Sequence, residues 1–234
     1  MSSSGPIKSG EKSKTKMTKV KICGNTSLED AKLAAELGAD YLGFIFAEGK
    51  RKIDLNQAKK IRDAMPDFEN FVAVFFNQSK EEVQSVASAL RIRTLQFHGD
   101  ETALYCQSFT SQGYNVIKTF RIKDAMSLKR LDEYDVEAFL FDAFSKEEKG
   151  GTGKTFDWNL IVNKPFVHEK LFLAGGLNVE NVAEAIQKVC PFAVDVASGV
   201  EKTPGKKDPE FLKKFISIVK EGKGQHVRKN FLRS

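Results

Sequence analysis

The fold is decided by a short apolar run, Phe71-Val72-Ala73-Val74-Phe75-Phe76. This run has the length of one strand, is rich in aromatic and β-branched residues, and is apolar on both of its faces. Strands of this kind lie in parallel sheets that are covered on both sides. Seven further runs of similar length and character recur along the chain, at residues 20–23, 41–46, 94–97, 116–118, 138–141, 171–174 and 192–196.

Amphipathic helical patterns lie between these runs. Apolar residues at the spacing i, i+3, i+4, i+7 recur in 83–90, 182–189 and 212–219, and each set forms one apolar stripe. Ser79 and Glu82 form a capping-box pair ahead of the first of these helices. Eight strand-like runs in strict alternation with about eight helical segments predict a parallel α/β sheet. Eight such units in a chain of this length favour a single-domain (β/α)8 TIM barrel, with a doubly wound open sheet as the alternative.

The 234-residue chain divides into one predicted domain and two tails. We expect a disordered basic leader at 1–18, the barrel at 19–221 and a basic tail at 222–234. The first 19 and the last 15 residues each carry a net charge of +4, so the body between them carries −2 of the total of +6. Nucleic-acid binding would need a basic face on the folded body, so we predict no nucleic-acid partner. The sequence leaves open whether Met1 or Met17 is the native start and what the tails do.

Composition also bears on the cellular compartment. No apolar run approaches the roughly 20 residues that span a bilayer, and the N-terminal residues lack the apolar core of a secretory signal. The three cysteines, Cys23, Cys106 and Cys190, show no CxxC spacing, which argues against a disulfide framework and a zinc site. We therefore expect a cytoplasmic protein with no membrane partner and no bound metal.

The active site of a (β/α)8 barrel lies at the C-terminal ends of its strands. The residues that follow the predicted strands include Cys23-Gly24, Arg51, His98-Gly99, Asp142, Gly175-Gly176 and Ser198-Gly199. Glycines let backbone N–H groups approach an anion closely, and the last two loops are the usual phosphate site of such barrels. We therefore expect Gly175, Gly176, Ser198 and Gly199 to bind phosphate; the alternative is two ordinary strand-to-helix turns.

An acid and a thiol are the candidates for proton transfer. Asp142 ends an apolar run, where an acid is unexpected unless it is paired or chemically useful. The glycine cluster at 150–153 follows it, which suggests a catalytic acid beneath a glycine-hinged lid. Cys23 would act as a base or nucleophile if a nearby cation stabilised its thiolate; otherwise it is a small buried apolar side chain. A capping or salt-bridged acid is the alternative for Asp142.

Three further side chains are candidates for binding. Arg51 could pair with a substrate carboxylate in bidentate fashion, or remain a solvated charge. Asp195 lies inside the last predicted strand, where it either orients a neighbouring group or accepts a structural hydrogen bond. His98 is expected to support or contact the substrate rather than act as the base. Lys118, near another strand end, leaves a Schiff-base aldolase open.

Five motifs carry a resemblance to a known family. They are Val20-Lys21-Ile22-Cys23-Gly24-Asn25-Thr26, Gln96-Phe97-His98-Gly99, Asp142 with Gly150-Gly151-Thr152-Gly153-Lys154-Thr155-Phe156-Asp157-Trp158, Ala174-Gly175-Gly176-Leu177-Asn178, and Asp195-Val196-Ala197-Ser198-Gly199-Val200-Glu201 with Pro204-Gly205-Lys206-Lys207-Asp208. In this order and at strand ends, from about residue 19 to about 220, they resemble phosphoribosylanthranilate isomerase.

The resemblance implies a (β/α)8 barrel of tryptophan biosynthesis that uses no cofactor or metal. Its reaction would be the Amadori rearrangement of N-(5′-phosphoribosyl)anthranilate to 1-(o-carboxyphenylamino)-1-deoxyribulose 5-phosphate. It places the general base on Cys23 and the general acid on Asp142, and it suggests Arg51 for the anthranilate carboxylate. His98 and Asp195 are expected to bind substrate. Members of the family occur as monomers and as homodimers, and the sequence does not choose between them.

One loop departs from the family's pattern. A serine usually stands two residues before the arginine of the second loop, whereas this chain has Gly49 there, preceded by Glu48. An acid near an anionic substrate is unfavourable. A related ribose-phosphate barrel isomerase or epimerase with an altered or broadened substrate range therefore stays as the alternative. A catalytically silent barrel that binds a phosphorylated metabolite or a partner is the third hypothesis.

Overall fold

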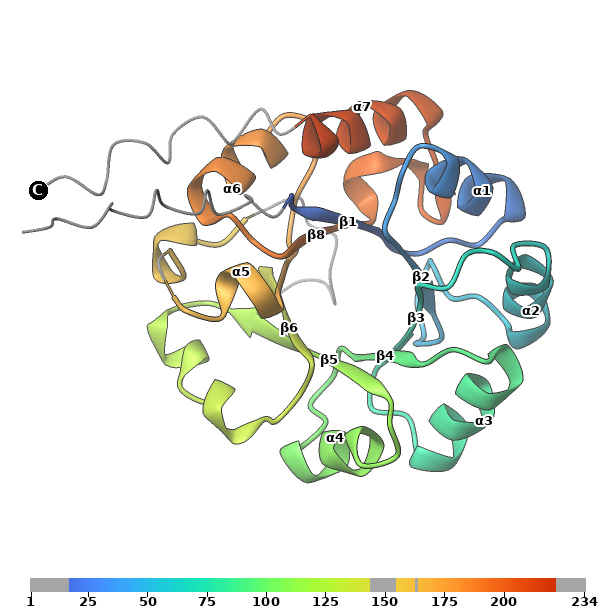
Figure 1. Cartoon of the computed structure of the whole chain (residues 1–234), viewed down its shortest axis with the longest axis horizontal. Coiled ribbons are helices and arrows are strands. Elements are labelled where there is room, and N and C mark those ends of the chain that lie inside the picture. The colour runs from blue at the N-terminus through green and yellow to red at the C-terminus, as the bar shows by residue number, and fades with distance from the viewer. Residues whose placement is uncertain (1–16, 144–154, 163, 222–234) are drawn as a thin grey trace, which may run out of the picture.

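The computed structural model describes residues 17–143, 155–162 and 164–221. They form a closed barrel of eight parallel strands that pair in chain order, with β1 hydrogen-bonded to β8 (Figure 1). The predicted (β/α)8 barrel is confirmed, and the open doubly wound sheet is excluded. The strands are β1 (Lys19–Ile22), β2 (Tyr41–Ile45), β3 (Phe71–Phe75), β4 (Thr94–Phe97), β5 (Asn115–Ile122), β6 (Ala138–Ala143), β7 (Leu171–Leu173) and β8 (Ala193–Val196).

Helices surround this barrel. They are α1 (Leu28–Glu36), α2 (Leu55–Asp63), α3 (Lys80–Leu90), α4 (Ala103–Thr110), α5 (Val167–Lys170), α6 (Val182–Val189) and α7 (Pro209–Lys220). The expected strict alternation with about eight helical segments is wrong at one connection. Two short 3-10 helices, η1 (Ala125–Leu128) and η2 (Leu131–Glu133), join β5 to β6 in place of an α-helix. No described helix is long and apolar enough to cross a membrane.

Side chains alternate between the two faces of each strand, as the period of two requires. In β1, Val20 and Ile22 pack outward into the core between the strands and the helices. The next inward position, Cys23, belongs to a second cluster inside the barrel, which also contains Val72, Val74 and Leu140. Polar side chains on the inward face therefore collect inside the barrel, and those near the strand ends open towards solvent.

Capping side chains fix where the helices begin. Ser27 and Ser79 accept backbone N–H bonds at the starts of α1 and α3, and the predicted Ser79–Glu82 capping box is confirmed. Gly38, with φ +99, follows the end of α1, where a left-handed residue stops the helix. Because α1 and α3 start a few residues after the C-terminal ends of β1 and β3, these two caps hold loops at the end of the barrel that carries the candidate site.

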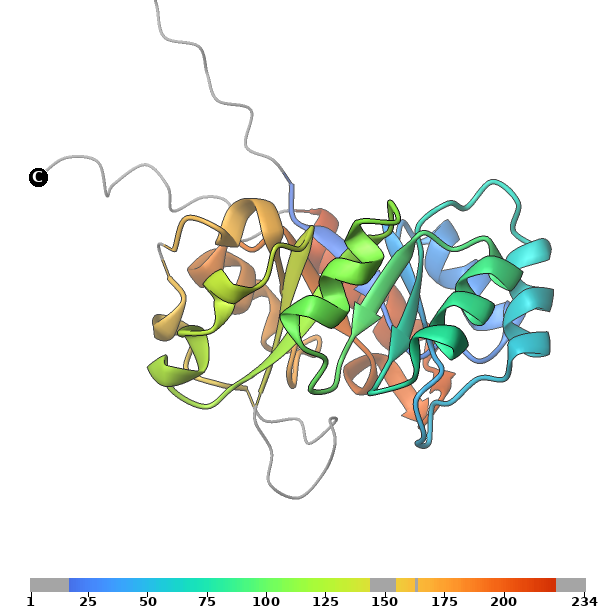
Figure 2. The ribbon, with the colours of Figure 1, turned by 90° about the horizontal axis from the view of Figure 1, so that it is seen from below.

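A short hairpin follows β8 and has no counterpart in the predicted elements. Its strands are β9 (Glu201–Thr203) and β10 (Lys206–Lys207), which pair antiparallel. Figure 2 shows it on the lower edge of the barrel, next to the loop after β2. The side-chain hydroxyl of Thr26 donates a hydrogen bond to the carbonyl of Gly205 at 2.5 Å, which connects the hairpin to the loop after β1.

Candidate active site

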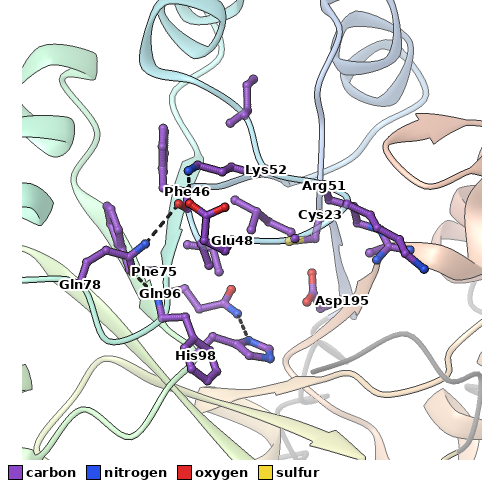
Figure 3. Close-up of a pocket in the computed structure, with 18 of the residues that line it drawn as sticks. Cys23, Phe46, Glu48, Arg51, Lys52, Phe75, Gln78, Gln96, His98 and Asp195 are labelled. Atoms are coloured by element: carbon purple, nitrogen blue, oxygen red, sulfur yellow. Dashed lines mark hydrogen bonds and ion pairs between the residues drawn. The ribbon is translucent and has the colours of Figure 1, made fainter. Parts of the chain in front are cut away.

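A cavity of ≈ 1210 Å³ opens at the C-terminal ends of the strands. Figure 3 shows Cys23, Arg51, His98 and Asp195 around it. Eight of the nine predicted site residues line it: Cys23, Arg51, His98, Asp142, Gly175, Gly176, Asp195 and Ser198. The ninth, Gly199, is not a lining residue. The structure therefore brings residues from six strand ends into one site.

The Cys23 thiol occupies space that a glycine leaves open. A Cβ atom on Gly43 of β2 would lie 2.7 Å from the Cys23 sulfur, closer than real contacts allow. Burial raises the pKa of the Cys23 thiol, while the charges of Lys21 and Lys207 act in the opposite direction and Asp195 adds to the rise. The net direction is upward, so burial disfavours the thiolate, while two nearby cations favour it.

Lys21 and Asp195 form an ion pair beside this thiol. The two residues are register partners on β1 and β8, and their side chains meet at 2.8 Å. Lys21 is fully buried, and its charge acts on Cys23 as well as on Asp195. Burial acts to lower the pKa of Lys21, but Asp195 and Cys23 outweigh it and raise that pKa. Asp195 thus accepts a hydrogen bond from Lys21, a contact that fits both readings, the orienting group and the structural acceptor.

Asp142 lies opposite, next to His98. The Asp142 carboxylate is 3.4 Å from Nε2 of His98. The side-chain amide of Gln96 is 3.0 Å from Nδ1 of the same ring, and the hydroxyl of Thr119 is 3.3 Å from it. The amide nitrogen of Gln96, a donor, faces Nδ1, and this arrangement favours the tautomer that carries its proton on Nε2, facing the acid. His98 therefore contacts Asp142 directly, and the expectation that it is not the base stays a prediction.

Gly175 allows the loop after β7 to approach the same acid. A Cβ at this position would lie 2.9 Å from the Asp142 carboxylate and 2.3 Å from the backbone nitrogen of Ala143. Its φ of +83 is also a conformation that other residues rarely adopt. A glycine is therefore required here both for space and for backbone geometry.

Arg51, after β2, is held by an acid from the hairpin after β8, on the far side of the single strand β1. Nε and Nη2 of Arg51 contact the Glu201 carboxylate at 2.9 Å and 2.7 Å. Among the described residues Nη1 has no hydrogen-bond partner, so it is the nitrogen left for a ligand. Gly24 makes room for this side chain, because a Cβ there would lie 2.9 Å from the Arg51 stem.

The two predicted phosphate loops touch each other. A Cβ on Gly199 would lie 2.0 Å from the carbonyl oxygen of Leu177. Asn181 donates to the carbonyl of Gly176 at 2.9 Å and accepts from the backbone of Asn178. The loops after β7 and β8 therefore form one connected surface at the cavity edge.

Two sequence hypotheses have different outcomes. The glycine cluster at 150–153, predicted to hinge a lid, lies outside the described residues. Lys118 does not line the cavity; its ammonium binds Glu101 at 2.9 Å and the carbonyl of Gly99 at 2.7 Å. A buried ammonium that is fully engaged and turned away from the cavity has no access to a carbonyl substrate, so the Schiff-base aldolase is excluded.

Sequence reasoning missed Lys21, Gln96, Glu201 and Lys207 as parts of the site. A lysine inside an apolar strand is rarely buried without a partner, so Lys21 carried a usable signal. Glu201 and Lys207 lay in a motif that had been noticed, but their partners are far away in the sequence. Within the described part of the chain, no group of three or more His, Cys, Asp or Glu side chains could hold a metal ion.

The fold and the cavity define the class: a (β/α)8-barrel enzyme with a thiol and a carboxyl group facing one site and a pair of glycine loops at its edge. The family model for N-(5′-phosphoribosyl)anthranilate isomerase matches residues 20–218. The chain belongs to this family, and it is an isomerase.

Individual relatives of this chain carry the same family name. The N-(5′-phosphoribosyl)anthranilate isomerase of Caldanaerobacter subterraneus subsp. tengcongensis is 45% identical over 205 residues, covering 87% of this chain and 98% of that protein. The crystal structure of the Thermotoga maritima enzyme superposes with a TM-score of 0.79 at 41% identity, covering 88% and 100% of the two chains. Another structure, of the isomerase in complex with reduced 1-(o-carboxyphenylamino)-1-deoxyribulose 5-phosphate, has a TM-score of 0.76 at 39% identity, covering 88% and 100%.

Proposed function

We propose that this enzyme converts N-(5′-phosphoribosyl)anthranilate to 1-(o-carboxyphenylamino)-1-deoxyribulose 5-phosphate in tryptophan biosynthesis, with Asp142 as general acid and Cys23 as general base. The observation that carries this assignment is that both groups line one cavity, each with a partner suited to its role. Neither step calls for a metal or a redox cofactor, because both are proton transfers.

The acid step opens the sugar ring. Asp142 donates its proton to the furanose ring oxygen, the C1′–O bond breaks, and the nitrogen lone pair forms a protonated Schiff base. The proton on Nε2 of His98 faces the carboxylate that remains, which stabilises its negative charge. Gly175 keeps the backbone close to this acid and limits where its side chain can move.

The base step moves a proton from carbon. The Cys23 thiolate removes the proton on C2′, and the electron pair flows towards the Schiff-base nitrogen to give an enolamine. The enolamine then tautomerises to the ketose. Lys21 and Lys207 stabilise the thiolate that must form first, and the Lys21–Asp195 pair fixes the nearer cation.

Binding groups surround these two. Nη1 of Arg51 would meet the anthranilate carboxylate, and His98 and Asp195 would contact the substrate between acid and base. The glycine loops at 175–176 and 198–199 would take the phosphate, since glycine backbone can turn N–H groups onto an anion. We infer a phosphorylated small molecule as the only partner that this site requires, in a cytoplasmic monomer or homodimer.

The test is turnover in two single variants. Cys23→Ala and Asp142→Asn should each lower kcat by several orders of magnitude while leaving the circular dichroism spectrum unchanged. Cys106→Ala is the matched control, because Cys106 is equally buried but lies in α4, away from the cavity. Near-normal rates in both site variants would overturn the proposed mechanism.

Substrate range is tested separately. Glu48, whose charge kept a broader range open, is ion-paired with Lys52 and largely exposed. This pairing weakens its repulsion of an anionic substrate. We therefore expect strong preference for the anthranilate compound over the related aminoaldose of histidine biosynthesis. Comparable kcat/KM values for the two would favour the broader enzyme instead.

A further inference from the structure

Glu201 has no role in the chemistry above, yet it is one of the most completely enclosed charges near the site. Its side chain is 3% exposed and sits at the start of the hairpin after β8. Two cations share it: Arg51 at 2.7 Å and Lys207 at 3.1 Å. Burial acts to raise the pKa of the Glu201 carboxyl, but these two partners outweigh it and hold that pKa below its usual value.

Lys207 extends the same contacts to the catalytic base. Its side chain is fully buried, and its ammonium donates to the backbone carbonyl of Cys23 at 2.6 Å. Its own backbone nitrogen donates to Asp30 of α1 at 3.0 Å. Burial lowers the pKa of Lys207, Glu201 opposes that change, and Arg51 adds to it. A continuous chain of polar contacts therefore runs from Arg51 through Glu201 and Lys207 to Cys23.

Two cations share one counter-ion at this place. Arg51 and Lys207 both contact the carboxylate of Glu201, which is almost completely enclosed, and Asp30 meets Lys207 only at its backbone nitrogen. Isolated charge is costly in such surroundings unless a counter-ion is supplied. A substrate carboxylate on the free Nη1 of Arg51 would supply that counter-ion.

We propose that Glu201 is a positioning residue that aims Arg51 at the substrate carboxylate, and that Lys207 ties Glu201 to the Cys23 backbone so that carboxylate site and base keep a fixed separation. This inference rests on the proposed function, in which Arg51 binds the anthranilate carboxylate. The hairpin after β8 then takes part in substrate recognition, although no atom of Glu201 or Lys207 needs to touch the substrate.

The decisive variant is Glu201→Asp, which keeps the charge and withdraws the carboxylate by about one carbon–carbon bond, roughly 1.5 Å. Steady-state kinetics with N-(5′-phosphoribosyl)anthranilate should show KM raised about tenfold or more, the penalty of a misaligned charged contact, with kcat much less affected. Glu201→Gln should also raise KM, because one amide oxygen cannot hold both Arg51 nitrogens. A lower KM in Glu201→Gln would show that Glu201 only shields Arg51, and would overturn the inference.

A double-mutant cycle separates aiming from general stability. If Glu201 acts through Arg51, Glu201→Asp should change KM little in an Arg51→Ala background. A double variant whose increase in KM equals the product of the two single increases would contradict this. Arg51→Ala alone with an unchanged KM would refute the carboxylate role in the proposed function. A raised KM in Arg51→Ala with a normal KM in Glu201→Asp would refute only the positioning role.

Two further variants distinguish a specific effect on KM from a general loss of stability. Asp40→Asn is the matched control, because Asp40 also serves two donors, Lys220 and the backbone of Val20, but belongs to the loop before β2, at the opposite end of the barrel. It should lower the melting temperature without changing KM. If Glu201→Asp does not fold, Lys207→Met serves instead; it should raise KM and also lower kcat, and normal values of both would overturn the inference.

Discussion

At the scale of single residues, three glycines determine where the side chains of three candidate site residues can lie. Gly24, Gly43 and Gly175 each stand where a Cβ atom would collide with another group, and those groups are Arg51, Cys23 and Asp142 in turn. Interiors are packed too tightly for such an overlap to be absorbed without movement. The positions of Arg51, Cys23 and Asp142 therefore depend on three glycines that have no chemistry of their own.

Gly43→Ala tests this dependence most cleanly. Gly43 lies in β2 without a positive φ, so alanine fits its backbone, but the new methyl group would lie 2.7 Å from the Cys23 sulfur. We expect a loss of stability of about 1–3 kcal/mol from overpacking. We also expect a fall in kcat well beyond that of a surface variant, measured at saturating substrate, because the thiol is displaced.

The control removes the sulfur itself. In a Cys23→Ala background, Gly43→Ala should cost less free energy of unfolding than it does in the wild type, because the closest collision is gone. Equal costs in both backgrounds, read from urea denaturation, would mean that the thiol is not what the methyl group meets.

Lys21 should set the pH at which the enzyme works. In the proposed mechanism the Cys23 thiolate is the base, so we expect kcat/KM to rise with pH as Cys23 loses its proton. Burial raises the pKa of this thiol and the charge of Lys21 lowers it, so Lys21→Met should raise it further. The rising limb of the pH profile should then move to higher pH, and activity near neutrality should fall.

Lys118→Met is a suitable comparison. Both lysines are buried and ion-paired, so each substitution should cost about 3–5 kcal/mol of stability by leaving a buried acid unpaired. Of these two lysines only Lys21 lies beside the Cys23 thiol, so only Lys21→Met should displace the pH profile. Identical profiles for wild type and Lys21→Met would remove Lys21 from the mechanism.

At the scale of elements, the apolar runs predicted all eight strands to within a few residues, because a strand buried on both faces has an unmistakable composition. The connection between β5 and β6 was predicted poorly. Its 3-10 helices, such as Leu131–Glu133, are only three or four residues long, and so are too short to show a 3.6-residue period.

The candidate site divides in the same way. Side chains such as Cys23 and Asp142 could be predicted, because barrel geometry brings every strand end to one place. The pairing of Arg51 with Glu201 could not, because the two are 150 residues apart and nothing local links them. Ion pairs across a closed barrel depend on its shear and on loop paths, which a single sequence does not encode in any local pattern.

The loops after β7 and β8 should behave as one element. Gly199 has no positive φ, but a Cβ there would lie 2.0 Å from the Leu177 carbonyl, so Gly199→Ala must push the loops apart. We expect weaker binding of inorganic phosphate as a competitive inhibitor and a higher substrate KM, with a smaller change in kcat.

Gly113→Ala provides the comparison. Gly113 has a φ of +82 with no atom near its missing Cβ, so its substitution costs stability through backbone strain alone. It lies before β5, away from the cavity, and should leave phosphate inhibition unchanged. Equal phosphate inhibition in Gly199→Ala and wild type would mean that the joined loops are not the phosphate site.

At the scale of the whole molecule, the described residues close the barrel by themselves. β1 pairs with β8 over four register positions, and α7 covers that seam, with Lys220 bonded to Asp40 at 2.7 Å. The predicted boundaries at 19 and 221 suggest that the basic tails are dispensable for folding and catalysis. A chain of residues 17–221 should therefore keep the melting temperature and kcat/KM of the full chain, at low and at physiological salt.

A second truncation shows where the fold must end. Removing α7 as well would delete Leu212, Phe215, Ile216 and Val219, which are all almost completely buried, and would uncover the core surface against which they pack. Burial of each is worth about 1.5–3 kcal/mol, and their sum rivals the ~5–15 kcal/mol that holds a whole domain together. A chain of residues 17–208 should therefore fail to fold. If residues 17–208 folded, α7 would not be needed to close the barrel. If residues 17–221 melted well below the full chain, the tails would contribute to its stability.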